Sequence, residues 1–304
     1  MLSMKGVIMF NDPIFKQDLP NGEILAYRKA GQKGPHLVLL HGNLSSSMHY
    51  STLMERLKNH FQLIAIDMRG FGDSTYHQPI TSLSDLAEDV WNLLDILKIS
   101  DCFLMGWSTG GGVGLEMAAM RPNKIKTLIL LSSIGIQGYT DPNKVNLAHL
   151  QFFPMLLNTN RAMAKWNPAL QKMEFALKNK DRKLLDKVLR PLYQYNPIPE
   201  EEFQLYLHAT CQQQNYSDIF LNLFTFNMSD KSNGITNGSN RYQLITAPIM
   251  IIHGDKDKVV SLESALLTYQ YLKKQATIHI LDAGHSILTD QPEQLDTILK
   301  RLIQ

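Results

Sequence analysis

Short apolar runs rich in branched residues recur along the chain, each bounded by turn residues, and predict buried strands. The six strongest runs are residues 37–40, 63–66, 102–105, 127–131, 249–252 and 277–281. Amphipathic stretches of helical period separate the first four, at residues 50–57, 83–97 and 113–120. Apolar strands that alternate with helices indicate a mostly parallel, doubly wound α/β sheet covered on both faces. Two weaker segments, 15–17 and 24–29, predict antiparallel strands at its edge.

The alternation stops after residue 131 and resumes near Pro248. The interval between them contains no strand-like run of similar strength. Its spaced apolar residues predict helices at 147–157, 162–177, 184–193 and 200–228. We therefore predict a core formed by residues 1–135 and 242–304 and interrupted by an inserted helical cap at 136–241. Such an insertion would lie over the strand ends, where α/β folds place their sites.

Composition narrows the function without deciding it. The 304 residues are 44% hydrophobic and 19% charged, enough to bury a large core. The net charge of +2, without a long Lys/Arg cluster, argues against nucleic acid or an anionic membrane as partner. Cys102 and Cys211 have no metal-ligand spacing, so we expect free thiols and no metal. No signal peptide or membrane-spanning run is found, and we expect a cytoplasmic protein.

A glycine-flanked serine follows the apolar run 102–105 and precedes a helix-compatible segment. The five residues are Gly106-Trp107-Ser108-Thr109-Gly110. This pattern is typical of a nucleophile elbow, in which a tight strand-to-helix turn projects the serine hydroxyl. A phosphate-binding loop is the alternative, but Gly112 and Val113 stand where a P-loop needs Lys and Ser or Thr, and no complete G-x-G-x-x-G is present.

A serine nucleophile requires a base to take its proton and an acid to orient that base. The run 249–252 leads to Asp255 and Asp257, and the run 277–281 leads to His285. The resulting order of serine, aspartate and histidine is the one found in α/β-hydrolases. Because all three loops follow strands, their side chains are predicted to meet at one edge of the sheet.

Together these motifs resemble those of the α/β-hydrolase superfamily, and the resemblance extends from about residue 20 to the C-terminus. Besides the elbow and the two loops, His41-Gly42-Asn43 resembles the family's oxyanion loop. Residues 67–74 resemble its D-x-R-G-x-G-x-S loop. The resemblance implies that the backbone N–H groups of Asn43 and Thr109 form the oxyanion hole.

The resemblance also assigns the acid and the base. Asp257 matches the family's G-x-x-D spacing from Gly254, whereas Asp255 fits a solvated turn residue. Some members carry the acid after the strand that follows the elbow, but residues 132–135 contain no carboxylate. His285 is the implied base.

Other polar residues near strand ends have structural interpretations. By family precedent His41 is a structural hydrogen-bonding residue, and His253 is expected as a buried neighbour of the acid loop. Asp67 and Arg69 are expected to fix the loop that follows their strand.

Substrate class is predicted from the cap and from the nucleophile. Dehalogenases and epoxide hydrolases of this fold attack with aspartate, so Ser108 favours acyl chemistry, with Asn43 acting through its backbone. Trp107 resembles the Gly-Trp-Ser elbow of pimeloyl-carrier methyl esterases and is a candidate substrate-binding residue. A few of the cap's aromatic and methionine residues are expected to line an apolar acyl pocket. They are Phe152, Phe153, Met155, Met163, Trp166, Met173, Phe175, Tyr193, Tyr195, Phe203, Tyr206, Phe224 and Phe226.

We therefore predict a serine hydrolase that cleaves a small, largely apolar carboxylic ester through an acyl-enzyme on Ser108. The implied partner is a small-molecule ester, and the chemistry needs neither a cofactor nor a metal. Two alternatives stay open at this stage. One is a carbon–carbon bond hydrolase or lactonase of the same fold, and the other is a hydrolase-fold ligand receptor with slow turnover.

Overall fold

The computed structural model describes residues 13–139, 168–193 and 195–304. Eight strands form one sheet in the order β1-β2-β4-β3-β5-β6-β7-β8. Strand β2 pairs antiparallel with both β1 and β4, and all other neighbours pair parallel, which confirms the predicted sheet. The strands are β1 (Ile14–Asp18), β2 (Ile24–Ala30), β3 (His36–Leu40), β4 (Gln62–Asp67), β5 (Cys102–Trp107), β6 (Ile125–Leu131), β7 (Ile249–Gly254) and β8 (Ala276–Leu281).

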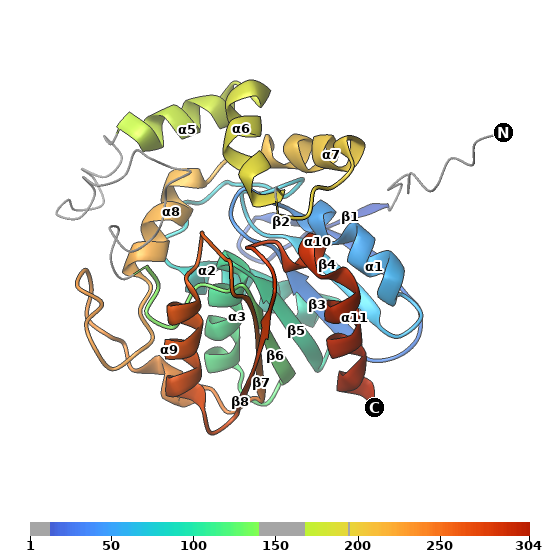
Figure 1. The fold of residues 1–304 in the computed structure, drawn as a ribbon, viewed down its shortest axis with the longest axis vertical. Coiled ribbons are helices and arrows are strands. Elements are labelled where there is room, and N and C mark those ends of the chain that lie inside the picture. Colours follow the sequence, from blue (N-terminus) through green and yellow to red (C-terminus); the bar gives the residue numbers. More distant parts are fainter. Residues whose placement is uncertain (1–12, 140–167, 194) are drawn as a thin grey trace.

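Helices cover both faces of the sheet (Figure 1). Successive side chains of a strand point to opposite faces, so the apolar strand β3 serves both layers. Val38 and Leu40 belong to the larger hydrophobic core with α2, α3 and α9, whereas Leu37 and Leu39 belong to a second core with α1 and α11. These helices are α1 (Ser51–Leu57), α2 (Leu83–Ile96), α3 (Thr109–Met120), α9 (Leu262–Leu272) and α11 (Pro292–Lys300).

The insertion between β6 and β7 is helical, as predicted, and lies over the carboxyl ends of the strands (Figure 1). Its described elements are α5 (Pro168–Lys178), α6 (Arg182–Leu189), the 3-10 helix η3 (Arg190–Tyr193), α7 (Glu200–Thr210) and α8 (Tyr216–Thr225). The predicted helix at 147–157 and the start of that at 162–177 lie outside the described residues. The stretch 200–228 is two helices rather than one, because Gln213 and Asn215 turn inward to bond loops of the core.

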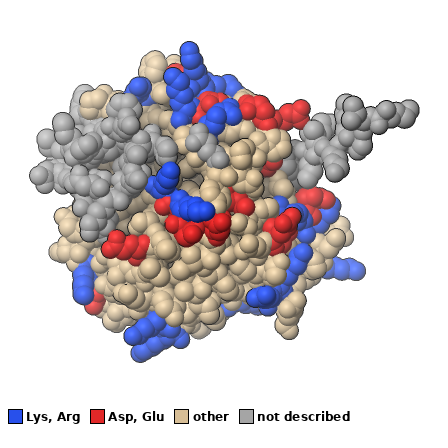
Figure 2. All heavy atoms as spheres, viewed as in Figure 1, with Lys and Arg blue, Asp and Glu red and all other residues tan. Residues whose placement is uncertain are grey.

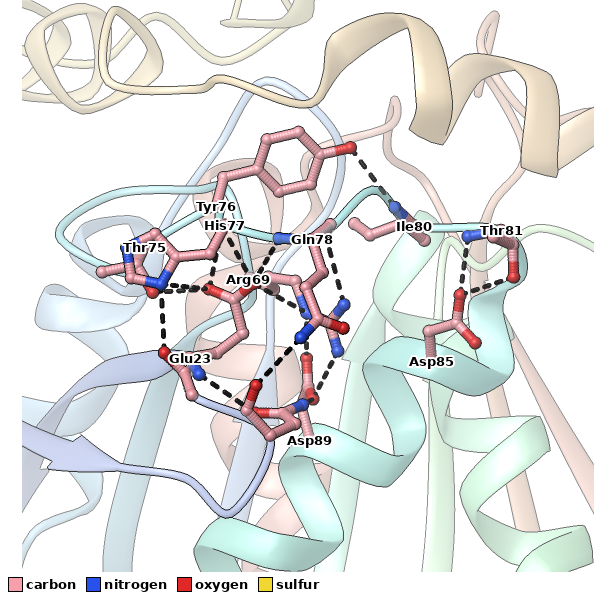
Figure 3. A network of polar contacts seen from close by, with 12 residues as sticks. Glu23, Arg69, Thr75, Tyr76, His77, Gln78, Ile80, Thr81, Asp85 and Asp89 are labelled. Carbon is pink, nitrogen blue, oxygen red and sulfur yellow. Dashed lines mark hydrogen bonds and ion pairs between the residues drawn. The ribbon is translucent and has the colours of Figure 1, made fainter.

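A buried ion network fixes the loop that follows β4 (Figure 3). The Arg69 guanidinium donates to both oxygens of Asp89 at 2.6 Å each. Glu23 is fully buried beside it and accepts from the backbone N–H groups of His77 and Gln78. Arg69 therefore has a structural role, and its carboxylate partners Asp89 and Glu23 are buried.

Charged side chains elsewhere are mixed in sign. On the face in Figure 2, Lys and Arg side chains stand beside Asp and Glu side chains rather than in one extended basic patch. Among the described residues, no helix is long and apolar enough to cross a bilayer.

Removing the Arg69 guanidinium should destabilise the fold strongly, because it leaves buried carboxylates without a counter-charge. We expect Arg69→Met to lower the free energy of unfolding by about 3–5 kcal/mol in urea denaturation. Lys126→Met is the control, since its ion pair with Asp101 is exposed and such pairs contribute about 0–1 kcal/mol. Equal losses from the two substitutions would contradict a buried network that holds this loop.

Candidate active site

Ser108 lies between β5 and α3 with φ 54° and ψ −118°, a backbone conformation that residues with a side chain rarely adopt. The turn closes only because its flanks are glycines. A Cβ on Gly106 would lie 2.2 Å from the Gly110 carbonyl oxygen, and one on Gly110 would lie 2.3 Å from that of Leu40. The local sequence therefore dictates the strained turn that presents the serine.

The structure brings Asp257 and His285 together from the loops after β7 and β8. His285 Nδ1 lies 2.7 Å from Asp257 Oδ2. The other oxygen, Oδ1, accepts the backbone N–H groups of Val259 at 2.8 Å and Val260 at 3.0 Å. Burial by itself would raise the pKa of Asp257, but His285, His253 and the hydrogen bond from Val260 together lower it below its ordinary value. An ionised Asp257 thus orients the imidazole with Nδ1 as the donor.

Asp255 and His253 take other roles. Asp255 is exposed and accepts the Ala283 N–H at 3.3 Å, so it ties the acid loop to the histidine loop. His253 is fully buried, and its Nε2 donates to the Val260 carbonyl at 2.9 Å. Its burial lowers its pKa. Of the two candidate acids, only Asp257 contacts His285.

The histidine loop is held by two side chains. Trp107 Nε1 donates to the His285 carbonyl at 3.0 Å, and Asp290 Oδ2 accepts the Gly284 N–H at 2.8 Å. Trp107 therefore both lines the cavity and holds the loop that carries His285. Asp290 was missed by sequence reasoning, because an aspartate within a short helix, α10 (Ile287–Asp290), carries no motif. Burial raises the pKa of Asp290.

The loop after β3 approaches Ser108 closely. A Cβ on Gly42 would lie 3.0 Å from Ser108 Cβ. Among the described residues, the backbone N–H groups of Asn43 and Thr109 have no hydrogen-bond partner, as an oxyanion hole requires. The buried ring of His41 also holds this loop. Its Nδ1 donates to the Gly42 carbonyl at 2.8 Å, and its Nε2 accepts the Met68 N–H at 3.1 Å.

Ser108, His285, Asn43 and Trp107 line one cavity of about 100 Å³. Its remaining walls are mostly apolar. They are formed by Gly42, Leu44, Tyr139, Val188, Leu189, Leu192, Tyr216, Phe220, Leu223 and Val259.

The prediction that a few aromatic and methionine residues of the cap line the pocket is tested only for those that the structure describes. None of the predicted aromatic and methionine residues that are described lines the cavity. Most pack into the cap's own core, and Phe175 is 66% exposed. The predicted residues between 152 and 166 lie outside the described residues.

A larger, open hollow of about 350 Å³ adjoins the cavity. Leu192, Val259 and His285 line both, so the hollow reaches His285. Lys256 and Lys258 also line it, and Lys256 pairs with Asp282. Among the residues that the structure describes, no three His, Cys, Asp or Glu side chains gather as metal ligands would.

Comparison with known proteins places this geometry in a family. The model of the alpha/beta hydrolase fold matches residues 35–292. The chain belongs to the α/β-hydrolase fold family.

Relatives of this α/β-hydrolase differ in activity. Epoxide hydrolase 4 of Homo sapiens is 23% identical over 90% of the chain and 74% of its own length. The 2-hydroxymuconate semialdehyde hydrolase of Pseudomonas sp. (strain CF600) is 24% identical over 82% of the chain and 80% of its own length. A solved esterase of Exiguobacterium antarcticum has a TM-score of 0.72 at 18% identity, covering 95% of the chain and 99% of that structure.

Asparagine at position 257 should keep the shape of the acid but favour the wrong histidine tautomer. We expect Asp257→Asn to lower kcat by about 10⁴, measured with an ester that the wild type hydrolyses. Asp255→Asn is the matched control and should cost far less, because Asp255 is exposed and does not contact His285. A greater loss from Asp255→Asn would overturn the assignment of the acid.

Proposed function

We propose that this α/β-hydrolase is a serine hydrolase that cleaves a small, largely apolar carboxylic ester through an acyl-enzyme on Ser108. One observation carries the proposal. A serine on a glycine-flanked elbow shares an apolar cavity with a histidine whose Nδ1 lies 2.7 Å from a buried aspartate. These are the parts that nucleophilic acyl transfer requires.

In the proposed reaction Ser108 Oγ attacks the ester carbonyl while His285 Nε2 takes the serine proton. Asp257 stabilises the imidazolium that forms, and the N–H groups of Asn43 and Thr109 stabilise the oxyanion. His285 then returns the proton to the alcohol oxygen as the carbon–oxygen bond breaks. Water, deprotonated by His285, attacks the carbonyl carbon of the acyl-enzyme. The carboxylic acid product then leaves as His285 returns the proton to Ser108 Oγ.

The cavity supports a short, uncharged acyl group. Its volume of about 100 Å³ is small beside the roughly 300–1,000 Å³ of typical ligand pockets. None of its described lining residues is Lys or Arg, so none of them would offer a lysine or arginine counter-charge to a carboxylate within it.

Two alternatives have different support. Carbon–carbon hydrolysis is favoured by the relationship to 2-hydroxymuconate semialdehyde hydrolase, and the same nucleophile and base would serve it. Epoxide opening is disfavoured, because the resemblance assigns that chemistry to an aspartate at the position of Ser108. A ligand receptor with slow turnover would keep the cavity but show negligible ester hydrolysis.

Loss of the nucleophile should remove turnover without removing the fold. We expect Ser108→Ala to lower kcat by about 10⁶, and a fluorophosphonate probe to label the wild type once, on Ser108. Circular dichroism should show the variant folded. A folded wild type that neither labels nor hydrolyses any ester would favour the receptor instead.

The small cavity predicts an optimum at short acyl chains. With p-nitrophenyl esters, kcat/KM should rise over the first few carbons of the acyl chain and then fall. Each buried CH₂ should lower the activation free energy by up to about 0.8 kcal/mol. Leu192→Ala should move the optimum to longer chains, because Leu192 lines both the cavity and the adjoining hollow. Leu205→Ala, at a position 37% exposed on α7, is the control. The same optimum in both variants would mean that Leu192 does not limit the acyl pocket.

A further inference from the structure

The cap holds both backbone polar groups of the residue that follows Asn43. The Leu44 N–H donates to Gln213 Oε1 at 3.0 Å, and Thr210 Oγ1 donates to the Leu44 carbonyl at 2.5 Å. Leu44 has φ 56°, which is costly for a residue with a side chain. Such a conformation persists only where its surroundings impose it. Here Gln213, Thr210 and the packing of the Leu44 side chain into the cap core impose it.

The same glutamine sets the side-chain amide of Asn43. Gln213 Nε2 donates to Asn43 Oδ1 at 2.7 Å and to Asn215 Oδ1 at 2.9 Å, and Asn215 Nδ2 donates to the Arg69 carbonyl at 2.6 Å. Backbone groups of fixed polarity stand at both ends of this chain, because the Leu44 N–H can only donate and the Arg69 carbonyl can only accept. Both ends require the same orientation of all three amides.

That orientation has a consequence for the site. Since Oδ1 of Asn43 is taken by Gln213, its Nδ2 is left as the donor, and it has no acceptor among the described residues. Asn43 lines the cavity beside Ser108. The amide chain thus offers the cavity an N–H₂ donor in addition to the backbone N–H of Asn43.

We propose that Gln213 of the cap is a positioning residue for the oxyanion loop, which fixes the Leu44 turn and presents the Asn43 side-chain amide to an oxygen of the bound substrate. The proposal rests on the proposed ester hydrolysis but goes beyond it. It assigns the cap a part in the rate of the chemical step, not only in the choice of acyl group. A protein without its cap would lose the contacts that hold this loop.

Three consecutive glutamines supply a matched test. Gln213 is buried, whereas the side chain of Gln214 is exposed. Gln213→Glu keeps the acceptor for the Leu44 N–H but, when ionised, cannot donate to Asn43 or Asn215. The Asn43 amide must then turn its Nδ2 towards the new carboxylate, which withdraws that donor from the cavity. Gln214→Glu introduces the same charge one residue away and leaves the amide chain intact.

We expect Gln213→Glu to lower kcat by about 10–10², the scale of a small misplacement in an active site, with little change in KM. The rate of Ser108 phosphonylation by a fluorophosphonate should fall similarly, and Gln214→Glu should match the wild type in both assays. The ratio of variant to wild-type kcat should recover in part as pH falls, because protonation of the introduced carboxylate restores one donor. Equal kinetics for the two variants, or a change in KM alone, would overturn the proposal.

A readout that needs no substrate separates this inference from the proposed function. Thr210→Val removes the donor to the Leu44 carbonyl, whereas Thr210→Ser keeps a hydroxyl. Hydrogen exchange at the Leu44 N–H should be faster in Thr210→Val and in Gln213→Leu than in Thr210→Ser and Gln214→Leu. If exchange changes as expected but the wild type neither labels nor hydrolyses esters, the cap holds the loop and the proposed function fails. If the wild type hydrolyses esters and exchange is unchanged, the inference about Gln213 fails alone.

Discussion

The positive φ of Ser108 is the constraint on which the site depends. Holding a non-glycine residue in such a conformation costs about 1–3 kcal/mol, which favourable contacts around it must offset. Here β5 packs closely against α3, and the Ser108 N–H donates to the Leu131 carbonyl at 3.0 Å. Because side chains at Gly106 and Gly110 would collide with backbone oxygens, the elbow admits almost no variation. Strain of this kind persists only where the surrounding structure imposes it.

The strand order explains why the other loops converge on that serine. β3, β5, β6, β7 and β8 lie side by side and parallel, so the loops after them end at one edge. Each loop is then fixed by its own polar contacts, for example the Asp257 carboxylate on the Val259 and Val260 N–H groups. The loop after β3 differs, since contacts from the cap hold its Leu44 turn. Residues of both the cap and the core therefore line the cavity beside Ser108.

The sequence predicted those features of the fold and the site that depend on residues close together in the chain. Apolar runs indicated the strands because a buried parallel strand is apolar on both faces, and the glycines around Ser108 predicted the turn because no other residue fits there. The spacing from Gly254 favoured Asp257, the only one of the two acids to contact His285 in the structure. Gln213 carries no such signal because its partners Leu44 and Asn43 are distant in sequence, and Asp290 carries none because it lies within a short, ordinary helix. The walls of the cavity also escaped prediction, because the choice between lining the cavity and filling the cap core depends on how α6 and α8 pack.

The most direct test of serine catalysis in this protein is to trap the acyl-enzyme. The wild type should be mixed with a short-chain p-nitrophenyl ester, quenched in acid within the first turnovers, and digested for mass spectrometry. We expect the mass of the acyl group on the peptide that carries Ser108, and none when Ser108→Ala is treated alike. Release of p-nitrophenol with the acyl group on another residue, or with no covalent intermediate while Ser108→Ala retains turnover, would contradict catalysis by Ser108.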